Sequence, residues 1–380
     1  MIIKNAKIVL KDNVIENGYL EVLNGKIKSI SKGSYKGKEE CVDAKGGIIM
    51  PGFIDVHVHG SAGIDFMDAN VDDYKVISKS LYNEGVTTYL ATTLTSDNAS
   101  LTRVCETVAK ASKENPSLYG IHLEGPYISV KYKGAQNEKF IRKPDFEELK
   151  QLHKSANGLV RYISLAPEYD NACDFISKAV KLGVVCSCGH TDATFDNVEA
   201  AIKVGLTNLT HTHNAMSPYH HRNPGVMNAA FYFDELNCEL ICDRIHVCDN
   251  TLKTFVKSVG ADRVIMITDA LKIKNSDIKE FQLFGLDCEE KNGAAYLKTG
   301  PLAGSLLTMD KGIRNMKEVC GLSLCELAKI SSYNAVKALH LNDRGEIAVN
   351  KLADFVILDD KLNLKAVYKL GEQVRWLNQF

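Results

Sequence analysis

The stretch PGFIDVHVHG, residues 51–60, is the starting point for interpreting the fold. It completes an apolar run, Ile48–Val58, which predicts a β-strand ending among acidic and imidazole side chains. Seven more strand candidates follow along the chain: Thr87–Thr93, Tyr119–Leu123, Arg161–Leu165, Val184–Ser187, Leu206–His211, Glu239–Ile241 and Val264–Ile267. Amphipathic segments of helical character separate them: Asp72–Glu84, Leu101–Lys113, Asp174–Lys181, Val198–Val204 and Leu252–Ser258, with more helix after Leu306.

A regular alternation of strands and helices predicts a parallel sheet, and eight such units predict closure into a (β/α)₈ TIM-like barrel. An open, doubly wound α/β sheet is the alternative. A GxGxxG turn after the first strand would favour the open sheet, but the Gly60–Gly63 stretch does not have that spacing. A barrel needs about 250 residues, so the 380 residues leave room for a small second domain.

Both ends of the chain consist of short apolar or alternating runs broken by turn residues, which is typical of β-hairpins. At the N-terminal end these runs are Ile2–Leu10, Tyr19–Val22 and Lys26–Ile30. At the C-terminal end they are Glu346–Val349, Asp354–Leu358 and Ala366–Leu370. We therefore predict that residues 1–50 and 346–380 form one small β-sandwich domain, and that residues 51–345 form the catalytic barrel.

The composition excludes several classes of protein. The 46 basic and 47 acidic residues leave a net charge of −1, which argues against a surface built for nucleic acid. The eleven cysteines include no CxxC pair, as expected for reduced thiols in a cytoplasm. No stretch approaches the ~18 apolar residues that cross a membrane. We expect a cytoplasmic protein that binds neither nucleic acid nor membranes.

The histidines follow the predicted strands closely. Seven of the eleven histidines lie at or just after the end of a strand candidate: His57, His59, His122, His190, His211, His213 and His246. Glu124 and Asp269 lie at equivalent places. Because the active site of such a barrel is built at the carboxyl ends of its strands, these side chains are expected to meet at one mouth, except His122, which is interpreted as structural.

His57 and His59 are two residues apart, so both project from the same face of their strand. An isolated pair of this kind is more often a hydrogen-bonded pair of core histidines. Together with His190, His211 and a carboxylate, however, a metal centre is favoured. This donor set without thiolate suits Zn²⁺ or Fe²⁺, and also Mn²⁺ or Co²⁺, with one or two ions bound.

Two carboxylates complete the predicted centre. Glu124, inside an apolar strand, is interpreted as a ligand that bridges two ions if two are present, the alternative being a cap for a backbone turn. Asp269 is interpreted as the group that takes a proton from water and passes it to a departing nitrogen, the alternative being a helix N-cap. The pattern predicts metal-assisted amide hydrolysis.

At this point the sequence resembles a known family, the N-acetylglucosamine-6-phosphate deacetylases of the amidohydrolase superfamily. The motifs that carry the resemblance are PGFIDVHVHG (51–60), HLEGPYIS (122–129), GHTDA (189–193), THTHNAMSP (210–218), ITDA (267–270), LAGS (302–305) and GEIAVNKLADFVILD (345–359). They occur in order over nearly the whole chain. The resemblance implies hydrolysis of the N-acetyl group of N-acetyl-D-glucosamine 6-phosphate.

The resemblance also assigns individual positions. Glu124, His190 and His211 correspond to the main metal site, His57 and His59 to a second ion present in some members, and Asp269 to the catalytic acid and base. Substrate contacts are expected from Ala135, Gln136, Asn214, Ala215, His246, Leu302, Ala303 and Gly304. Arg222 matches an arginine that reaches the sugar phosphate in the neighbouring subunit, which implies a homodimer.

Two positions depart from the family pattern. His213 stands where relatives usually carry an aromatic ring, and Gln136 stands where some relatives carry a histidine. Three other functions remain open: a deacetylase of a related phosphorylated amino sugar, a cyclic amidohydrolase, and a scaffold without activity. The cyclic enzymes often use a carboxylated lysine as bridging ligand, and no lysine closes a strand candidate here. A scaffold would be expected to lose its ligands and Asp269 first, yet all are present.

Overall fold

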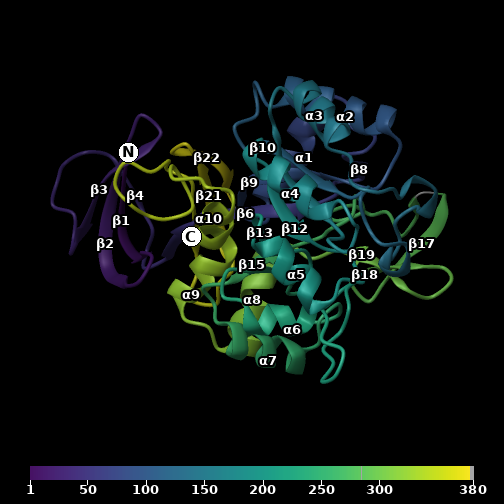
Figure 1. The fold of residues 1–380 in the computed structure, drawn as a ribbon. Helices are drawn as coiled ribbons and strands as arrows, with labels where there is room; N and C mark the ends of the chain where they lie inside the picture. Colours follow the sequence, from purple (N-terminus) through teal and green to yellow (C-terminus); the bar gives the residue numbers. More distant parts are fainter. Residues whose placement is uncertain (284, 377–380) are drawn as a thin grey trace.

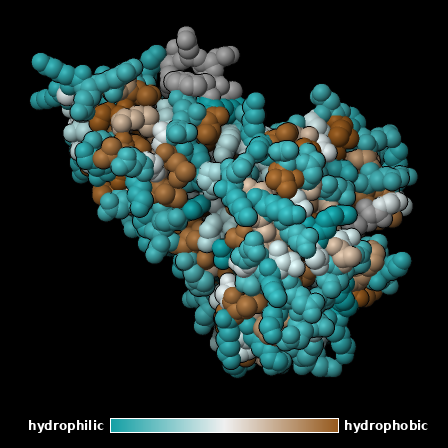
Figure 2. Space-filling view, turned by 90° about the horizontal axis from the view of Figure 1, so that it is seen from above, coloured by the Kyte–Doolittle hydropathy of each residue, from teal (hydrophilic) through white to brown (hydrophobic). Residues whose placement is uncertain are grey.

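The structure, a computed structural model, describes residues 1–283 and 285–376. The chain forms a barrel and a smaller sheet that lies beside it, with the N-terminal strands and the C-terminal strands together in the smaller sheet (Figure 1). In the space-filling view the smaller sheet is a separate lobe at the upper left, and hydrophobic residues occur on this face only in scattered patches (Figure 2). Among the described residues, no helix is both long and apolar enough to cross a membrane.

Eight parallel strands form the barrel, and each pairs with the next one along the chain. They are β6 (Phe53–Val58), β9 (Val86–Thr93), β10 (Leu118–Glu124), β11 (Val160–Leu165), β12 (Val185–Cys188), β13 (Leu206–Leu209), β14 (Asn237–Ile241) and β15 (Val264–Ile267). Two backbone hydrogen bonds join the first strand to the segment after the last one. The N–H of Asp269 donates to the carbonyl of His57, and that of His59 to the carbonyl of Ala270. The predicted (β/α)₈ barrel is therefore confirmed.

Helices follow the strands and cover the outside of the barrel (Figure 1). The main ones are α1 (Asp73–Tyr82), α2 (Asn98–Ala111), α3 (Phe146–Ser155), α4 (Ala172–Lys181), α5 (Phe195–Ile202), α6 (Val226–Tyr232), α7 (Asp249–Val259) and α8 (Met309–Cys320). Shorter helical segments are η1 (Val130–Tyr132), η2 (Glu138–Phe140), α9 (Leu324–Ala328), η3 (Lys329–Tyr333) and α10 (Asn334–Ala338). Each main helix buries one apolar stripe against the strands, as in α2, where Leu101, Val104, Cys105 and Val108 are buried.

The run Ile48–Val58 is two strands, so its prediction as one strand was wrong. Its first part is β5 (Ile48–Pro51), which belongs to the smaller sheet, and its second part is the barrel strand β6. Gly52 separates them, and its N–H donates to the carbonyl of Asp354 in the smaller sheet. A Cβ at Gly52 would lie 2.3 Å from Oγ1 of Thr87, so a residue without a side chain is needed where the chain passes into the barrel.

The smaller sheet has the strand order β22-β21-β20-β5-β1-β2-β3, with β4 paired to β1. Its strands are β1 (Ile2–Val9), β2 (Val14–Leu23), β3 (Lys26–Lys32), β4 (Cys41–Asp43), β20 (Phe355–Leu358), β21 (Leu364–Lys369) and β22 (Glu372–Trp376), besides β5. Its two ends approach each other, because Gly25 lies against Leu370. The sheet thus folds around its own buried core, as the predicted β-sandwich requires.

The predicted strand Glu346–Val349 is absent from the described structure, so this prediction was wrong. Ile347 packs into the core of the smaller sheet, but backbone pairing with β3 begins only at Asn350, whose N–H donates to the carbonyl of Ile27. The apolar pattern of Glu346–Val349 therefore reflects the burial of Ile347 and not a β-strand.

A four-stranded antiparallel sheet was not predicted. It consists of β16 (Glu280–Leu283), β17 (Leu286–Lys291), β18 (Ala294–Leu297) and β19 (Leu302–Ser305), placed between β15 and α8. It projects from one end of the barrel (Figure 1). Its apolar side chains pack against Leu94 and Leu271 at the mouth of the barrel, so we call this sheet the covering sheet. A two-stranded ribbon, β7 (Gly60–Ser61) and β8 (Ile64–Asp65), follows β6.

Candidate active site

The predicted site residues lie at the carboxyl ends of five barrel strands. His57 and Glu124 belong to the last residues of β6 and β10, whereas His190, His211 and Asp269 each lie two residues beyond a strand. The latter three have φ angles of 47°, 30° and 48°. Left-handed backbone is rare for residues other than glycine and is concentrated at functional sites. The turn after each strand directs these three side chains to one place.

Glu124, His190 and His211 form the first of two histidine–carboxylate groups. Oε1 of Glu124 lies 3.1 Å from Nε2 of His190 and 3.1 Å from Nε2 of His211. The two imidazole nitrogens are 3.0 Å apart. All three side chains are buried, so these polar atoms face one another away from bulk water.

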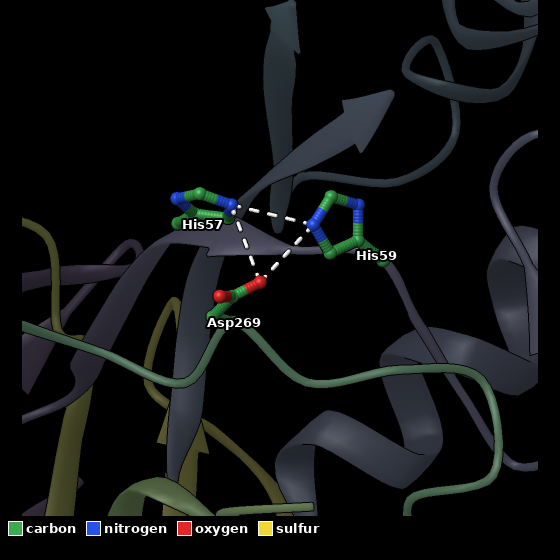
Figure 3. A group of neighbouring side chains, drawn as sticks. All are labelled: His57, His59 and Asp269. Carbon is green, nitrogen blue, oxygen red and sulfur yellow. Dashed lines mark hydrogen bonds and ion pairs between the residues drawn. The ribbon is translucent and has the colours of Figure 1, made fainter. Parts of the chain in front are cut away.

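His57, His59 and Asp269 form the second group, and their side chains point toward one another (Figure 3). Nε2 of His57 and Nε2 of His59 are 3.3 Å apart, and they lie 3.4 and 3.1 Å from Oδ1 of Asp269. Glu124 joins this group to the first, because Oε1 lies 3.3 Å from Nε2 of His57 and Oε2 lies 3.4 Å from Nε2 of His59.

These separations fit a metal centre. Ligand atoms about 2.0–2.2 Å from one tetrahedral ion are about 3.3–3.6 Å apart, close to the 3.0–3.4 Å found here. Two bare imidazole nitrogens repel at 3.0 Å unless a proton or a cation lies between them. Nitrogen and carboxylate donors without thiolate suit divalent zinc, iron, manganese or cobalt. The residues present therefore fit one or two such ions.

Hydrogen bonds hold several of these donors in place. Nδ1 of His190 lies 2.8 Å from the carbonyl oxygen of Tyr132, and Nδ1 of His57 lies 3.1 Å from Oε2 of Glu239. Nε2 of Gln136 donates to Oε2 of Glu124 at 2.5 Å, while its Oε1 accepts from the N–H of Thr95. Gln136 thus fixes the rotamer of Glu124, which both groups share.

The charges around the two acids keep them ionised. Burial alone would raise the pKa of Glu124, but the imidazoles of His57 and His190 hold it well below its usual range. Burial would also raise the pKa of Asp269, yet His57 and His59 lower it to about 2. Both residues are therefore carboxylates at neutral pH.

A cavity of about 190 Å³ opens onto these groups. Its lining contains eight of the nine predicted substrate-binding residues: Ala135, Gln136, Asn214, Ala215, His246, Leu302, Ala303 and Gly304. Four further lining residues were not predicted: Leu94, Gly134, Leu271 and Leu283. The covering sheet supplies Leu283 and the Leu302–Gly304 stretch, so it forms one wall of the cavity.

Three of the polar residues discussed above do not line this cavity: Arg222, His213 and His122. Arg222 is exposed and does not line the cavity of its own subunit. His213 is also absent from the lining, and its ring packs against Phe255 with centroids 4.8 Å apart. His122 is fully buried, between the carbonyl of Val56 and the hydroxyl of Ser164, which agrees with its predicted structural role.

Two buried acids that contact the site were not predicted as part of it. Asp55 accepts hydrogen bonds from the N–H groups of His57 and Thr268, and so connects β6 to the segment that carries Asp269. Glu239 contacts His57 from β14. The signal was available, since each is a lone acid within an apolar strand, as Glu124 is.

A (β/α)₈ barrel with two histidine–carboxylate groups at the carboxyl ends of its strands has the architecture of a metal-dependent enzyme. The model described as "Amidohydrolase family" matches residues 48–374. The chain belongs to the amidohydrolase family.

Similar proteins of known name indicate the branch of the amidohydrolase family. Proteins of Lysinibacillus sphaericus and Bacillus subtilis, each named N-acetylglucosamine-6-phosphate deacetylase, are 35% and 37% identical over 98% and 94% of this chain, and 97% and 93% of their own length. A protein of Escherichia coli O157:H7 named N-acetylgalactosamine-6-phosphate deacetylase is 28% identical over 98% of both chains. The resemblance drawn from the motifs is confirmed.

Solved structures agree. N-acetylglucosamine-6-phosphate deacetylase of Thermotoga maritima matches with a TM-score of 0.91 and 36% identity, over 99% of this chain and all of that one. An aspartate-to-alanine mutant of the Mycobacterium smegmatis enzyme, in complex with N-acetyl-D-glucosamine-6-phosphate, matches with a TM-score of 0.94 and 30% identity, over 98% and 99% of the two chains.

Proposed function

We propose that this chain hydrolyses N-acetyl-D-glucosamine 6-phosphate to D-glucosamine 6-phosphate and acetate. The observation that carries the proposal is the meeting of Glu124, His190, His211 and Asp269 at one cavity. It is supported by relatives of that name that align over nearly the whole chain. Such a reaction belongs to amino-sugar breakdown.

The two groups are proposed to hold one or two divalent ions. Glu124, His190 and His211 would hold the first ion, and His57 and His59 a second, with Glu124 facing both. Zinc or iron is the preferred identity, and manganese or cobalt also suits these donors. A bound cation supplies Lewis acidity toward both water and the amide carbonyl.

Asp269 is proposed as the proton-transfer group. Its pKa, held at about 2 by His57 and His59, leaves it unprotonated and able to accept a proton from the attacking water. An amine leaves poorly unless it is protonated, so the same carboxyl group then gives that proton to the nitrogen of the departing amino sugar.

The remaining lining residues are proposed to position the sugar. His246 is held by Asp243, whose Oδ2 lies 2.6 Å from its Nδ1. Asn214, Ala215 and Ala135 line the cavity with Gln136, and the covering sheet closes it with Leu302, Ala303 and Gly304. The cavity therefore offers the substrate polar groups, such as those of Asn214, Gln136 and His246, together with small and apolar residues of the covering sheet.

Arg222 is proposed to bind the sugar phosphate in the site of a second subunit of a homodimer. It is exposed and outside its own cavity, and a guanidinium matches the geometry of a phosphate group. A cytoplasmic location is also proposed, because all eleven cysteines are unpaired.

The decisive test is release of acetate from N-acetyl-D-glucosamine 6-phosphate by the purified protein. Turnover should disappear after treatment with a chelator and return when a divalent ion is added back, because the Lewis acid is then restored. A protein that carries stoichiometric metal yet releases no acetate would contradict the proposal.

The galactosamine epimer is the second candidate substrate, because a relative 28% identical to this chain carries the corresponding name. A higher kcat/KM on N-acetyl-D-galactosamine 6-phosphate than on the glucosamine epimer would replace the first assignment with the second.

A further inference from the structure

Glu239 is a buried acid that contacts a histidine of each of the two histidine–carboxylate groups. It belongs to β14, has an exposed fraction of 0% and does not line the cavity. Its Oε2 lies 3.1 Å from Nδ1 of His57 and 3.2 Å from the backbone nitrogen of His211. One oxygen atom therefore contacts one histidine of each group.

This contact determines which nitrogen of His57 carries a proton. An ionised carboxylate only accepts hydrogen bonds, so Nδ1 of His57 is the donor. With an ion bound, Nε2 of His57 would offer it a lone pair, and this atom faces Glu124, His59 and Asp269. A histidine that binds a metal through Nε2 needs this tautomer, and a charged acceptor also makes the ring a stronger ligand.

The contact between Oε2 of Glu239 and the N–H of His211 acts on the backbone of His211. His211 has a φ of 30°, a conformation that persists only where neighbouring groups hold it. Its N–H donates to Glu239, which fixes the turn that carries its imidazole toward Glu124. Glu239 thus acts on both groups at once.

Glu239 is not itself part of another metal site. His57, His122 and Glu239 lie close enough to share an ion, but both nitrogens of His122 are engaged, with the carbonyl of Val56 and the hydroxyl of Ser164. A neutral ring that donates to a carbonyl and accepts from a hydroxyl has no lone pair left for a metal.

A purely structural role also fits poorly. Within the described residues, Oε2 of Glu239 makes two hydrogen bonds and Oε1 makes none, and the hydroxyl of Tyr162 lies near the carboxyl group. A buried charge with an unsatisfied oxygen costs folding free energy.

We propose that Glu239 is a positioning residue that sets the tautomer of His57 and the backbone turn of His211, so that both present Nε2 to the ions. This inference rests on the proposed metal centre. It assigns to Glu239 a role in metal binding rather than in substrate binding or folding.

The test is Glu239→Gln, which keeps the shape of the side chain but removes its charge. Affinity for Zn²⁺ or Co²⁺, measured by competition with a chromogenic chelator, should fall about 10- to 100-fold for at least one ion. The metal-free variant should unfold at the same temperature as metal-free wild type or higher. Turnover should fall through kcat with KM nearly unchanged, because Glu239 does not reach the cavity.

Tyr162→Phe is the matched control, because it removes a buried hydroxyl near the Glu239 carboxyl group and leaves both contacts of Oε2 in place. Its metal affinity should stay within about threefold of wild type. Wild-type metal affinity in Glu239→Gln would overturn the proposal, and so would a loss of metal-free stability that parallels the loss of affinity. A wild-type protein that binds no ion would instead refute the metal centre itself.

Discussion

Asp269, His190 and His211 share a left-handed backbone conformation two residues beyond a strand end. Each such residue costs of order 1–3 kcal/mol, which neighbouring contacts must offset. At Asp269 the stabilising contacts include the hydrogen bond from its N–H to the carbonyl of His57. At His211 they include the hydrogen bond from its N–H to Glu239. The positions of the donors are therefore built into the backbone as well as into the side chains.

Asp269→Asn should retain the ion at Glu124, His190 and His211 but lose most turnover. Asparagine cannot accept the proton that the carboxylate is proposed to take, so kcat should fall by about 10²–10⁴. Metal analysis alongside steady-state kinetics checks this expectation. Turnover equal to that of wild type would remove Asp269 from the proton-transfer role.

Residue patterns predicted which donors meet, because strand ends share one side of a barrel. They did not predict what holds these donors. Glu239 opens a predicted strand in the sequence, and only the structure shows that its carboxylate reaches His57. For Arg222, a phosphate-binding role was expected only from the family resemblance, because an arginine in a loop is otherwise an ordinary exposed cation.

At the scale of elements, α2 illustrates how a barrel helix is fixed beside the site. It follows β9 and the segment that contains Thr95, whose N–H holds Gln136. Asp97 caps its first turn, accepting from the N–H and the hydroxyl of Ser100. These bonds hold the pKa of Asp97 below its usual value.

Asp97→Ala should lower the free energy of unfolding by about 1 kcal/mol at pH 7, because the cap is lost. Since the pKa of Asp97 is lower in the folded than in the unfolded protein, its contribution is complete above about pH 4. It is lost as the pH falls through the folded-state value, so the two proteins should converge in acid. Denaturant unfolding at several pH values checks this.

Asp72→Ala is the control, because Asp72 precedes α1 without a side-chain capping bond. Its effect should stay within about 0.5 kcal/mol at every pH. A pH-independent difference for Asp97→Ala would contradict the capping explanation.

The barrel strands were predictable because each is a buried apolar run flanked by amphipathic helix. The covering sheet was not. Its strands Glu280–Leu283 and Leu286–Lys291 are largely exposed or half-buried and carry several charges, so neither periodicity nor hydrophobicity marks them. They are stabilised by contact with Leu94 and Leu271, which only the folded barrel provides.

At the scale of the molecule, the site is proposed to be completed by a second subunit. Mixed dimers test this directly. A dimer of one Arg222→Ala subunit and one Asp269→Asn subunit, isolated with two affinity tags, should have one intact site and about half of wild-type activity at low substrate concentration. Each homodimer should be impaired, because every site then lacks one of the two groups.

If Arg222 acted within its own subunit, the mixed dimer would contain no intact site, and its activity would be no higher than that of the two mutant homodimers. A monomeric protein with full activity would also contradict the shared site.

The smaller sheet joins β5 to β20, which lie roughly 300 residues apart in the chain. At translation rates of about 5–20 residues per second, a ribosome delivers β20 some 15 to 60 seconds after β5. Throughout that interval the nascent chain carries an unpaired strand edge, the kind of edge that invites pairing with other chains. Stalled or prematurely terminated translation would leave that edge open.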